Sequence, residues 1–581
     1  MAPKRVLLLT NSEHGQANVF LATSYALLTS FQHEDVEVHF ASFPAIEKAV
    51  ASTSDHARRT NPSARPIVFH PIDGIDMVSA WSRPELTAER ESLKTVDTVQ
   101  LVYAIRRMKL LLKVTLPWNG PEFVQIMDSI GCILAATRPA VVAVDPAFSP
   151  ALTALRHLRQ NFIVLSPNSI KDFAMPMQPD GEPLWKYPCI GSPDTFPVPA
   201  SHIPANILLV LLAIILAGFF DSHRRAIETY VRTHTAGAAR LTTLNDLSLN
   251  PGLGIRFLVA NLPEMEFPLA VLPGYILPCG PMLRPYAPLE EADPTLAKWI
   301  ARGPTVYVNL GTHLFLDENF AVEMATALRI MLERVRGVLW RDDRLQEIQV
   351  LWKLMRRGEY EVEGPGSRVG EILGEEMKSG RVKIVEWIDA EPLAVLERDT
   401  VICAVHHGGA NSFLEAVSAG IPQVVLPVWM DTYDFARRAE ILGIGRWGNQ
   451  QTQGAVCRGD ELGAALVDVL IGGRSSLYTA RAKELAKLCK RSGGGRVVAA
   501  RRILAEILDV FLGLVDRRLG LVGRDLELAG RRLGLIAARR LKVPFDNELQ
   551  LAIGPDDLGS VPHRQSDKLE IGHGNAVGVQ P

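Results

Sequence analysis

Several features that would assign a protein class at once are missing from this sequence. Its 581 residues carry a formal net charge of −2, without the basic excess that is typical of nucleic-acid-binding proteins. Its cysteines form no CxxC pair, which argues against a zinc site or a disulfide framework and suits a reducing compartment. They are scattered along the chain as Cys132, Cys189, Cys279, Cys403, Cys457 and Cys489. The chain is too long for one ordinary core, so we expect two large domains.

The N-terminus, MAPKRVLLLTNSEHG, does not have the pattern of a signal peptide. Its apolar run, VLLL, is far shorter than the hydrophobic region of a signal peptide, and a polar turn follows at once. We interpret this run as a first buried strand that leads into a loop. The expected location is therefore the cytoplasm, and two segments further along leave membrane association open.

Apolar strands alternate with helical patterns twice along the chain, which is the rhythm of a parallel α/β sheet. The first run opens with RVLLLTN, and the second opens with TVYVNLGT at 305–312. We predict an N-terminal Rossmann-like domain over 1–280, a proline-rich linker over 281–300 and a C-terminal domain over 301–510. Two such domains face a cleft, and ligands bind there at the carboxyl ends of the strands.

Residues 171–275 of the first domain are less regular and contain an uncharged segment, ILLVLLAIILAGFF, at 207–220. As a helix this segment would be about 21 Å long, short of the ~30 Å hydrocarbon core of a membrane. Three interpretations stay open: a helix that is buried or lines a ligand site, an interfacial helix that dips into a membrane, and a true span. A span would separate the two halves of a shared site.

A C-terminal tail over 511–581 follows the second domain. Residues 512–541 repeat the letters RRLGL, with paired arginines on one side. This segment fits either a basic amphipathic helix for an anionic membrane surface or a low-complexity appendage. The remainder is polar and glycine-rich, and we expect it to be disordered.

The stretch most informative about function is HHGGANSFLEAVSAG at 406–420, between two apolar runs. Strand, glycine turn and helix follow one another here, and the helix N-terminus in such a unit commonly binds a phosphate. Asn411 and Ser412 can cap the helix or donate to phosphate oxygens. Glu415 lies one turn further along the same face, about 6 Å away, where a carboxylate can accept ribose hydroxyls. A nucleoside diphosphate therefore suits this helix, and a plain capped helix is the alternative.

Two residues in the same domain strengthen the nucleotide interpretation. Trp387 follows RVKIVE at a strand end, where its ring can stack on a base. Asp431 ends the next strand after the glycine turn, where a carboxylate can hold sugar hydroxyls. The order along the chain is then base, phosphate, ribose and sugar.

The segment from Trp387 to Glu440 resembles the donor-binding signature of the UDP-dependent glycosyltransferases of family 1, which have the GT-B fold. The plant signature reads W-x-P-Q, then H-C-G-W-N-S-x-x-E, then G-V-P-x-x-x-x-P-x-x-x-D-Q. The motifs HHGGANS and YDFARRAE are similar to those of the fungal members of this family. Weaker matches to the family extend over about residues 5–510. The matching letters are Trp387, His407, Gly408, Gly409, Asn411, Ser412, Glu415, Gly420, Pro422, Pro427 and Asp431.

The resemblance implies a role for each matched residue. Trp387 would stack on uracil and Glu415 would bind the ribose. The phosphates would be held by His407, Gly408, Gly409, Asn411 and Ser412, with Thr312 of the NLGT loop. Asp431 and Thr432 would face the transferred sugar. Two departures matter: Glu391 stands in for the glutamine of W-x-P-Q, and Thr432 replaces the usual final glutamine, so the uracil-edge contacts and the sugar stay open.

The resemblance also implies a catalytic pair in the first domain. His14 follows the first strand in NSEHGQ, in the loop where the family places its base as G-H-x-x-P, although the proline is missing here. Histidine has the unperturbed pKa that such a base needs. Asp145, at the end of PAVVAVD, matches the aspartate that orients the base; taken alone, it also fits a plain turn before a proline.

We therefore expect an inverting UDP-sugar-dependent glycosyltransferase. The resemblance implies UDP-glucose as the donor, and the acceptor is expected to be a hydroxyl of a lipophilic small molecule. A secondary metabolite or a sterol-like molecule fits the apolar first domain. No cofactor or metal is expected, since the sequence has no cluster of ligands. The alternatives are another nucleotide-sugar enzyme of the same fold, either an epimerase or an N-acetylglucosaminyltransferase acting on a lipid carrier, and a non-catalytic binder of UDP or lipid.

Overall fold

The computed structural model describes residues 3–507 without 93–99, 251, 253, 313, 338–344, 346, 429–430 and 453–455. All of the described residues lie within one compact unit, Met1–Phe511. The predicted tail, including the arginine repeat at 512–541, lies outside the described residues.

The first sheet has seven parallel strands in the order β3-β2-β1-β4-β5-β6-β7. Its central strands contain uncharged runs with both faces buried, at residues 6–9 of β1 and throughout β4 and β5, as a parallel sheet covered on two sides requires. The strands are β1 (Lys4–Leu9), β2 (Val36–Ser42), β3 (Val68–Pro71), β4 (Val141–Val144), β5 (Ile163–Ser166), β6 (Phe257–Val259) and β7 (Ile276–Pro278).

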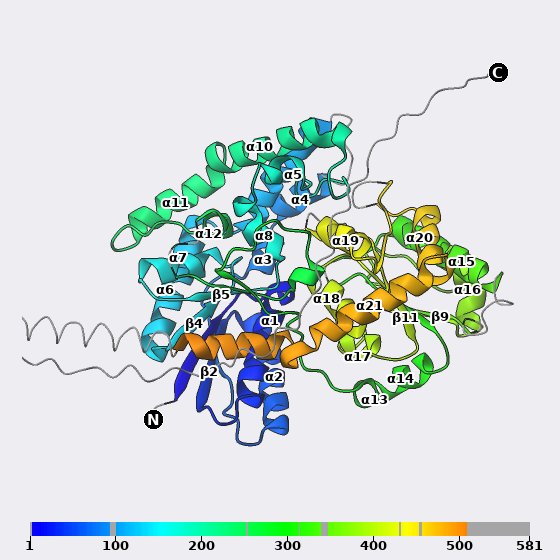
Figure 1. Ribbon diagram of the computed structural model, residues 1–581, viewed down its shortest axis with the longest axis horizontal. Coiled ribbons are helices and arrows are strands. Elements are labelled where there is room, and N and C mark those ends of the chain that lie inside the picture. Colours follow the sequence, from blue (N-terminus) through cyan, green and yellow to red (C-terminus); the bar gives the residue numbers. More distant parts are fainter. Residues whose placement is uncertain are drawn as a thin grey trace, which may run out of the picture. The chain divides into compact units, whose positions relative to one another are not determined.

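Helices surround this sheet and include several in the segment that we predicted to be irregular (Figure 1). They are α1 (His14–Thr29), α2 (Glu47–Thr60), α3 (Met77–Trp81), α4 (Pro84–Ser92), α5 (Gln100–Thr115), α6 (Gly120–Thr137), α7 (Ser149–His157), α8 (Ile170–Ala174), α9 (Glu182–Trp185), α10 (Ile203–Phe219), α11 (Ser222–His234) and α12 (Leu244–Leu249).

The second sheet has six parallel strands in the order β10-β9-β8-β11-β12-β13, which confirms the prediction of two parallel α/β sheets. Its strands are β8 (Thr305–Asn309), β9 (Gln349–Lys353), β10 (Val382–Val385), β11 (Val401–His406), β12 (Gln423–Val425) and β13 (Gly445–Trp447). Its helices are α13 (Leu289–Ala292), α14 (Pro294–Ile300), α15 (Glu318–Arg336), α16 (Arg368–Lys378), α17 (Pro392–Leu396), α18 (Ala410–Ala419), α19 (Thr432–Ile441), α20 (Gly459–Ile471) and α21 (Ser475–Cys489).

His14 is the first residue of α1, so the prediction that it lies in a loop is wrong. The side chain of Glu13 caps this helix by accepting a hydrogen bond from the backbone N–H of Gln16. An acidic residue at this position satisfies a free N–H group and favours an early helix start. The helix therefore begins directly after the strand β1 and its short turn, and His14 stands at its N-terminal end.

The apolar segment forms α10, and the interpretation of a buried core helix is wrong. Only Asn206 and Leu216 of this helix are buried. One side packs against α5 through Met108, and the Asn206 amide donates to the backbone carbonyls of Leu184 and Tyr187. Several large apolar side chains are exposed: Leu208, Leu211, Ile214, Ile215 and Phe219, followed by Phe220.

The last described helix, residues 495–507, packs on the first sheet although it follows the second along the chain (Figure 1, orange). Glu506 pairs with Arg256 at 2.6 Å, and Arg496 lies over the ring of Tyr25. Where the chain returns, Gly495 touches Gly280: a Cβ on Gly495 would lie 2.0 Å from the carbonyl oxygen of Gly280. The two passages of the chain between the sheets are therefore in direct contact.

Candidate active site

The helix α18 begins at the predicted glycine turn and has an open N-terminus. Its N-cap is Gly409, and no side chain caps the helix, so the capping alternative for Asn411 and Ser412 is wrong. Gly408 has φ +85°, and a Cβ there would lie 2.7 Å from the Thr432 carbonyl oxygen. Only glycine fits this contact. The first-turn N–H groups of α18 are consequently left for an anion, as a phosphate-binding helix requires.

The two adjacent histidines have different environments. His406 ends β11 in the core, where its Nε2 lies 2.7 Å from the Gln423 amide oxygen, and burial lowers its pKa to about 4. This histidine is neutral and structural. His407 is only half-buried, and its ring lies against Gly311 and Gly409. A Cβ atom added to Gly311 would lie 2.6 Å from the His407 ring, and one added to Gly409 would lie 2.5 Å from it. Thr312 follows Gly311 and is exposed at the same strand ends.

The ribose position predicted for Glu415 contains a second carboxylate and an arginine. Burial and the nearby charge of Glu391 raise the pKa of Glu415 to about 8, against the opposing effect of Arg284. Glu391 pairs with the same guanidinium at 3.1 Å. Below them, the buried hydroxyl of Tyr307 accepts a hydrogen bond from Asn309, and burial, with both carboxylates, raises its pKa. The structure therefore brings the predicted Glu391 and Glu415 together.

Trp387 follows β10 and is 53% exposed, as a ring that stacks on a base needs to be. Its ring centroid lies 4.0 Å from the Nζ atom of Lys353, the last residue of β9. Sequence analysis did not identify Lys353, because one lysine in VLWKL looks like an ordinary strand residue.

Asp431 and Thr432 lie at the start of α19. The Asp431 side chain reaches solvent, but the protein around it desolvates the carboxylate and raises its pKa to about 6. The negative charges of Asp172, Asp434 and Glu13 add to this effect. Thr432 is buried, with its backbone against Gly408. The candidate sugar-facing residues therefore adjoin the glycine turn of α18 and residues of the first sheet's loops.

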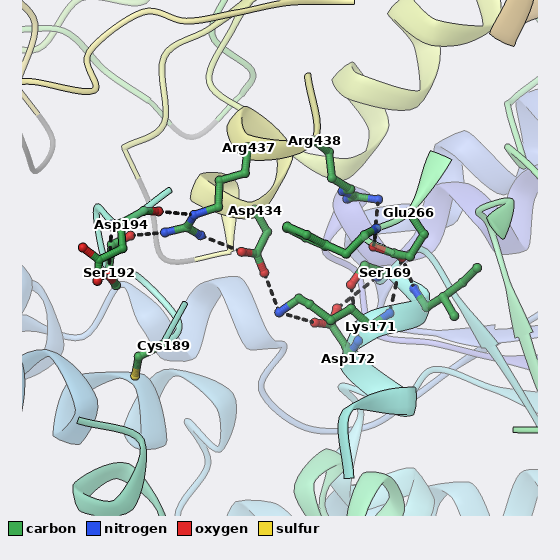
Figure 2. A network of polar contacts seen from close by, with 12 residues as sticks. Ser169, Lys171, Asp172, Cys189, Ser192, Asp194, Glu266, Asp434, Arg437 and Arg438 are labelled. Carbon is green, nitrogen blue, oxygen red and sulfur yellow. Dashed lines mark hydrogen bonds and ion pairs between the residues drawn. The ribbon is translucent and has the colours of Figure 1, made fainter. Parts of the chain in front are cut away.

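A buried ionic network fixes α19 to segments that follow the first sheet's strands (Figure 2). The Asp434 carboxylate forms ion pairs with Lys171 of α8, at 2.7 Å, and with Arg437, at 2.6 Å. Arg437 also donates to the backbone carbonyls of Ser192 and Asp194. Each cation has a charged or carbonyl acceptor, so the network resists separation of these segments. No sequence motif indicates this network, because its two sides lie more than 200 residues apart along the chain.

Asp145 follows β4 and is fully buried at the end of the neighbouring strand to β1. Its carboxylate accepts hydrogen bonds from the side chains of Thr10 and Asn11 and from the backbone N–H of Ala147. Burial raises its pKa to about 7 in spite of these donors. The strand pairing Leu9 with Val144 places Asp145 at the same sheet edge as His14, which is exposed.

The candidate donor helix and the candidate base meet directly. The side-chain amide of Asn411 donates to the backbone carbonyls of His14, at 3.4 Å, and Gly15, at 3.5 Å. The charge of Glu13 raises the pKa values of both Asp145 and Asp431, so this carboxylate lies near both. His14, the glycine turn with Asn411, and Thr432 thus adjoin one another where α1, α18 and α19 begin.

Known proteins resemble this chain over its second sheet and over nearly its whole length. Residues 376–488 match the family described as Erythromycin biosynthesis protein CIII-like, C-terminal domain. The glycosyltransferase sdnJ of Sordaria araneosa is 31% identical over 517 residues, which cover 84% of this chain and 95% of that protein. The chain belongs to the family 1 UDP-dependent glycosyltransferases. The predicted family and enzyme class are thereby confirmed.

Solved structures agree with the GT-B fold of this glycosyltransferase. A UDP-glucosyltransferase from Polygonum tinctorium superposes with a TM-score of 0.54 at 15% sequence identity, covering 87% of this chain and 99% of its own. LpCGTa, solved in complex with UDP, gives a TM-score of 0.52 at 18% identity over the same shares. The predicted GT-B fold is confirmed. Among the described residues of the glycosyltransferase, no three His, Cys, Asp or Glu side chains form a group that could hold a metal ion.

Proposed function

We propose that this glycosyltransferase transfers a sugar from UDP-glucose to a hydroxyl group of a lipophilic small molecule and inverts the anomeric configuration. The observation that carries the proposal is the contact of Asn411 with the His14 carbonyl, which brings an uncapped helix N-terminus to the helix that begins with the candidate base. A diphosphate bound at the N-terminus of α18 and an acceptor hydroxyl bound at the start of α1 would be neighbours.

The reaction is a single displacement. His14 takes the proton from the acceptor hydroxyl, and the oxygen attacks the anomeric carbon opposite the diphosphate. The bond from this carbon to the diphosphate oxygen breaks, UDP leaves with the electron pair, and an α-linked donor gives a β-glycoside. Asp145 in its ionised form stabilises the protonated imidazole. The N–H groups of α18 and the ring of His407 stabilise the negative charge that develops on the leaving diphosphate.

Donor binding would use residues from four strand ends. Trp387 stacks on the uracil, Glu415 accepts the ribose hydroxyls, and Glu391 lies beside it on Arg284. Thr312, Asn411 and Ser412 hold the diphosphate. Asp431 accepts hydroxyls of the sugar, and Thr432, whose side chain is buried, limits the space beside it. No metal takes part in this scheme.

The acceptor would bind over the segment 171–275, and we place it among hydrophobic secondary metabolites or sterol-like alcohols. The relative sdnJ is named only as a glycosyltransferase, so its name does not specify an acceptor. The support for a lipophilic acceptor is the apolar content of this segment, which includes α10.

A membrane surface is the proposed partner of α10, and the protein is cytoplasmic in this proposal. The stretch Ala200–His234 is helical and apolar enough to cross a membrane by length and composition, and 11% of its most apolar window is buried. The contacts of Met108 and Asn206 hold one side of α10 against the protein, which favours a helix lying on the interface over a spanning one. The adjoining α11 carries Arg225 and Arg232, which suit an anionic lipid surface.

The membrane proposal is tested by flotation of the protein with vesicles that contain anionic phosphatidylserine. The double substitution Leu211→Glu with Ile214→Glu should abolish flotation. Leu477→Glu, which places a charge on an exposed leucine of α21, should leave flotation unchanged. If both variants float like the unchanged protein, or if α10 proves to be a contact between two copies by light scattering, the membrane proposal fails.

The function itself is tested first by calorimetric titration with UDP in the presence of a chelator. Binding that Glu415→Ala removes, and that Glu375→Ala on the exposed face of α16 keeps, supports the donor site. His14→Ala should then abolish glucoside formation from UDP-glucose on a panel of lipophilic alcohols while UDP affinity stays unchanged. Turnover of UDP-N-acetylglucosamine alone would favour the lipid-carrier alternative, and retained transfer by His14→Ala would exclude His14 as the base.

A further inference from the structure

The site contains a buried cation that no acidic side chain of the described residues neutralises. Lys353 is 7% exposed, and among the described residues its ammonium group has one hydrogen-bond acceptor, the backbone carbonyl of Gly311, at 3.1 Å. An ammonium group has three donors, so two remain for another acceptor. Burial lowers the pKa of Lys353, and no nearby carboxylate opposes this effect. A buried charge without a counter-charge is unfavourable, and such a group is commonly retained for a ligand.

The position of Lys353 is at the centre of the donor site. Strand pairing aligns Lys353 with Asn309 of β8 on one side and with Val385 of β10 on the other. Its ammonium nitrogen lies 4.0 Å from the ring centroid of Trp387, two residues beyond β10. The carbonyl that it contacts belongs to Gly311, whose Cα faces the ring of His407.

Lys353 therefore connects the two ends of a bound nucleotide. On one side is the ring expected to stack on the base, and on the other are the loop and the histidine expected to face the phosphates. A cation held over an aromatic face is stabilised by the ring, which lowers the unfavourable free energy of keeping it buried while the site is empty. An incoming anion would then find a positive charge already in place.

We propose that Lys353 is a donor-binding residue whose ammonium group pairs with the diphosphate of the UDP-sugar and supplies positive charge to the leaving group. This inference rests on the proposed function, because it takes UDP as the ligand. The other role open to Lys353 is purely structural: it could only support the ring of Trp387.

Comparison of UDP with uridine separates these roles, since uridine has the base and ribose but lacks the phosphates. If Lys353 pairs with the diphosphate, Lys353→Met should weaken UDP binding by at least tenfold and uridine binding by less than threefold. Lys353→Arg should recover most of the UDP affinity, because the charge is kept. If Lys353 only supports Trp387, both ligands should lose affinity by the same factor, and this result would overturn the inference.

The measurement is calorimetric titration of each variant with UDP, and with uridine in competition. A matched control is Lys378→Met, which removes an 81% exposed lysine from α16 and should change neither affinity. Partial unfolding of a variant lowers the binding stoichiometry and leaves the ratio of the two dissociation constants unchanged, so the test holds for a weakened fold. Failure of the unchanged protein to bind UDP would reject the proposed function itself, whereas equal losses in Lys353→Met reject only the role of Lys353.

Discussion

The side-chain amide of Asn411 lies 3.4 Å from the backbone carbonyl oxygen of His14, although almost 400 residues separate the two along the chain. The first turn of α18 is thereby joined to the first turn of α1. Donor binding and proton transfer are expected on either side of this contact, so substitutions that alter it should change the rate of sugar transfer.

Replacing Asn411 with alanine should lower kcat/KM by roughly fivefold or more, since one hydrogen bond is worth about 1 kcal/mol and 1.36 kcal/mol corresponds to a factor of ten. The variant removes both the carbonyl contacts and a donor to the phosphates. Steady-state kinetics with UDP-glucose measure the effect, and circular dichroism checks the fold. Unchanged kinetics would show that the contact has no part in transfer.

The pKa of Asp145, raised to about 7 by burial, predicts the pH dependence of the reaction. The carboxylate stabilises the protonated His14 only when it is ionised, so kcat/KM should rise as the pH increases through about 7. Asp145→Asn should lower kcat/KM by between about 10²- and 10⁴-fold and remove the part of this rise that comes from ionisation of the carboxylate, while the part that comes from His14 stays. A wild-type profile that falls across the same range would contradict the assigned role.

Glu415 predicts a proton release on UDP binding. Burial and Glu391 raise its pKa to about 8, so the carboxyl is mostly protonated at pH 7 before UDP binds. Acceptance of ribose hydroxyls favours the ionised form and lowers this pKa. UDP affinity should therefore increase as the pH rises toward 8, with protons released below that pH.

Calorimetry in two buffers of different ionisation enthalpy measures this proton release. Glu391→Gln should reduce it, because removal of the neighbouring negative charge lowers the pKa of Glu415 in the free protein. Glu375→Ala is again the control. Equal binding enthalpies in both buffers for the unchanged protein would exclude linked ionisation of Glu415.

The ion pair of Lys171 with Asp434 predicts a large effect on stability. Lys171→Met removes one of the two buried cations that pair with Asp434, and we expect a loss of about 3–5 kcal/mol in the free energy of unfolding. The pair lowers the pKa of Asp434, so its contribution should be present at neutral pH and lost as the pH falls below the ordinary aspartate range. Urea denaturation at pH 7 and at about pH 2, below the ordinary aspartate pKa, measures both effects.

A double-mutant cycle provides the control for this prediction. Lys171→Met combined with Asp434→Asn should be more stable than the sum of the single losses implies, since each single substitution already removes the interaction between the two side chains. Additive losses would mean that the two side chains contribute independently.

The strands that carry the site were predictable from the sequence, because each is a short apolar run followed by a glycine or a polar turn. The run before Trp387 placed this residue correctly just beyond β10, and Glu415 lies in the predicted helix α18. The prediction that Asp431 ends a strand is wrong, because β12 ends at Val425 and Asp431 is the N-cap of α19. The start of α1 was missed, since it depends on the side chain of Glu13 acting as a cap. A local capping bond of this kind changes the place of His14 without changing the apolar pattern.

Other residues were missed because their importance comes from distant partners. Lys353 and Arg284 acquire a role only when strands and the linker come together, and neither lies in a recognisable motif. The exposure of α10 could not be predicted either. A segment that is apolar on every side has no polar face to indicate which side meets solvent.

The contact of Gly280 with Gly495 has a consequence for anyone who wishes to express half of the molecule. A fragment that ends at the linker would have the first sheet without residues 495–507, and its Arg256 and Tyr25 would lose their partners. A fragment from 281 to 507 would contain the helix at 495–507 without the first-sheet residues that it packs against. Clean separation requires 281–494 alone, with 495–507 supplied to the first half as a peptide or joined to it by circular permutation.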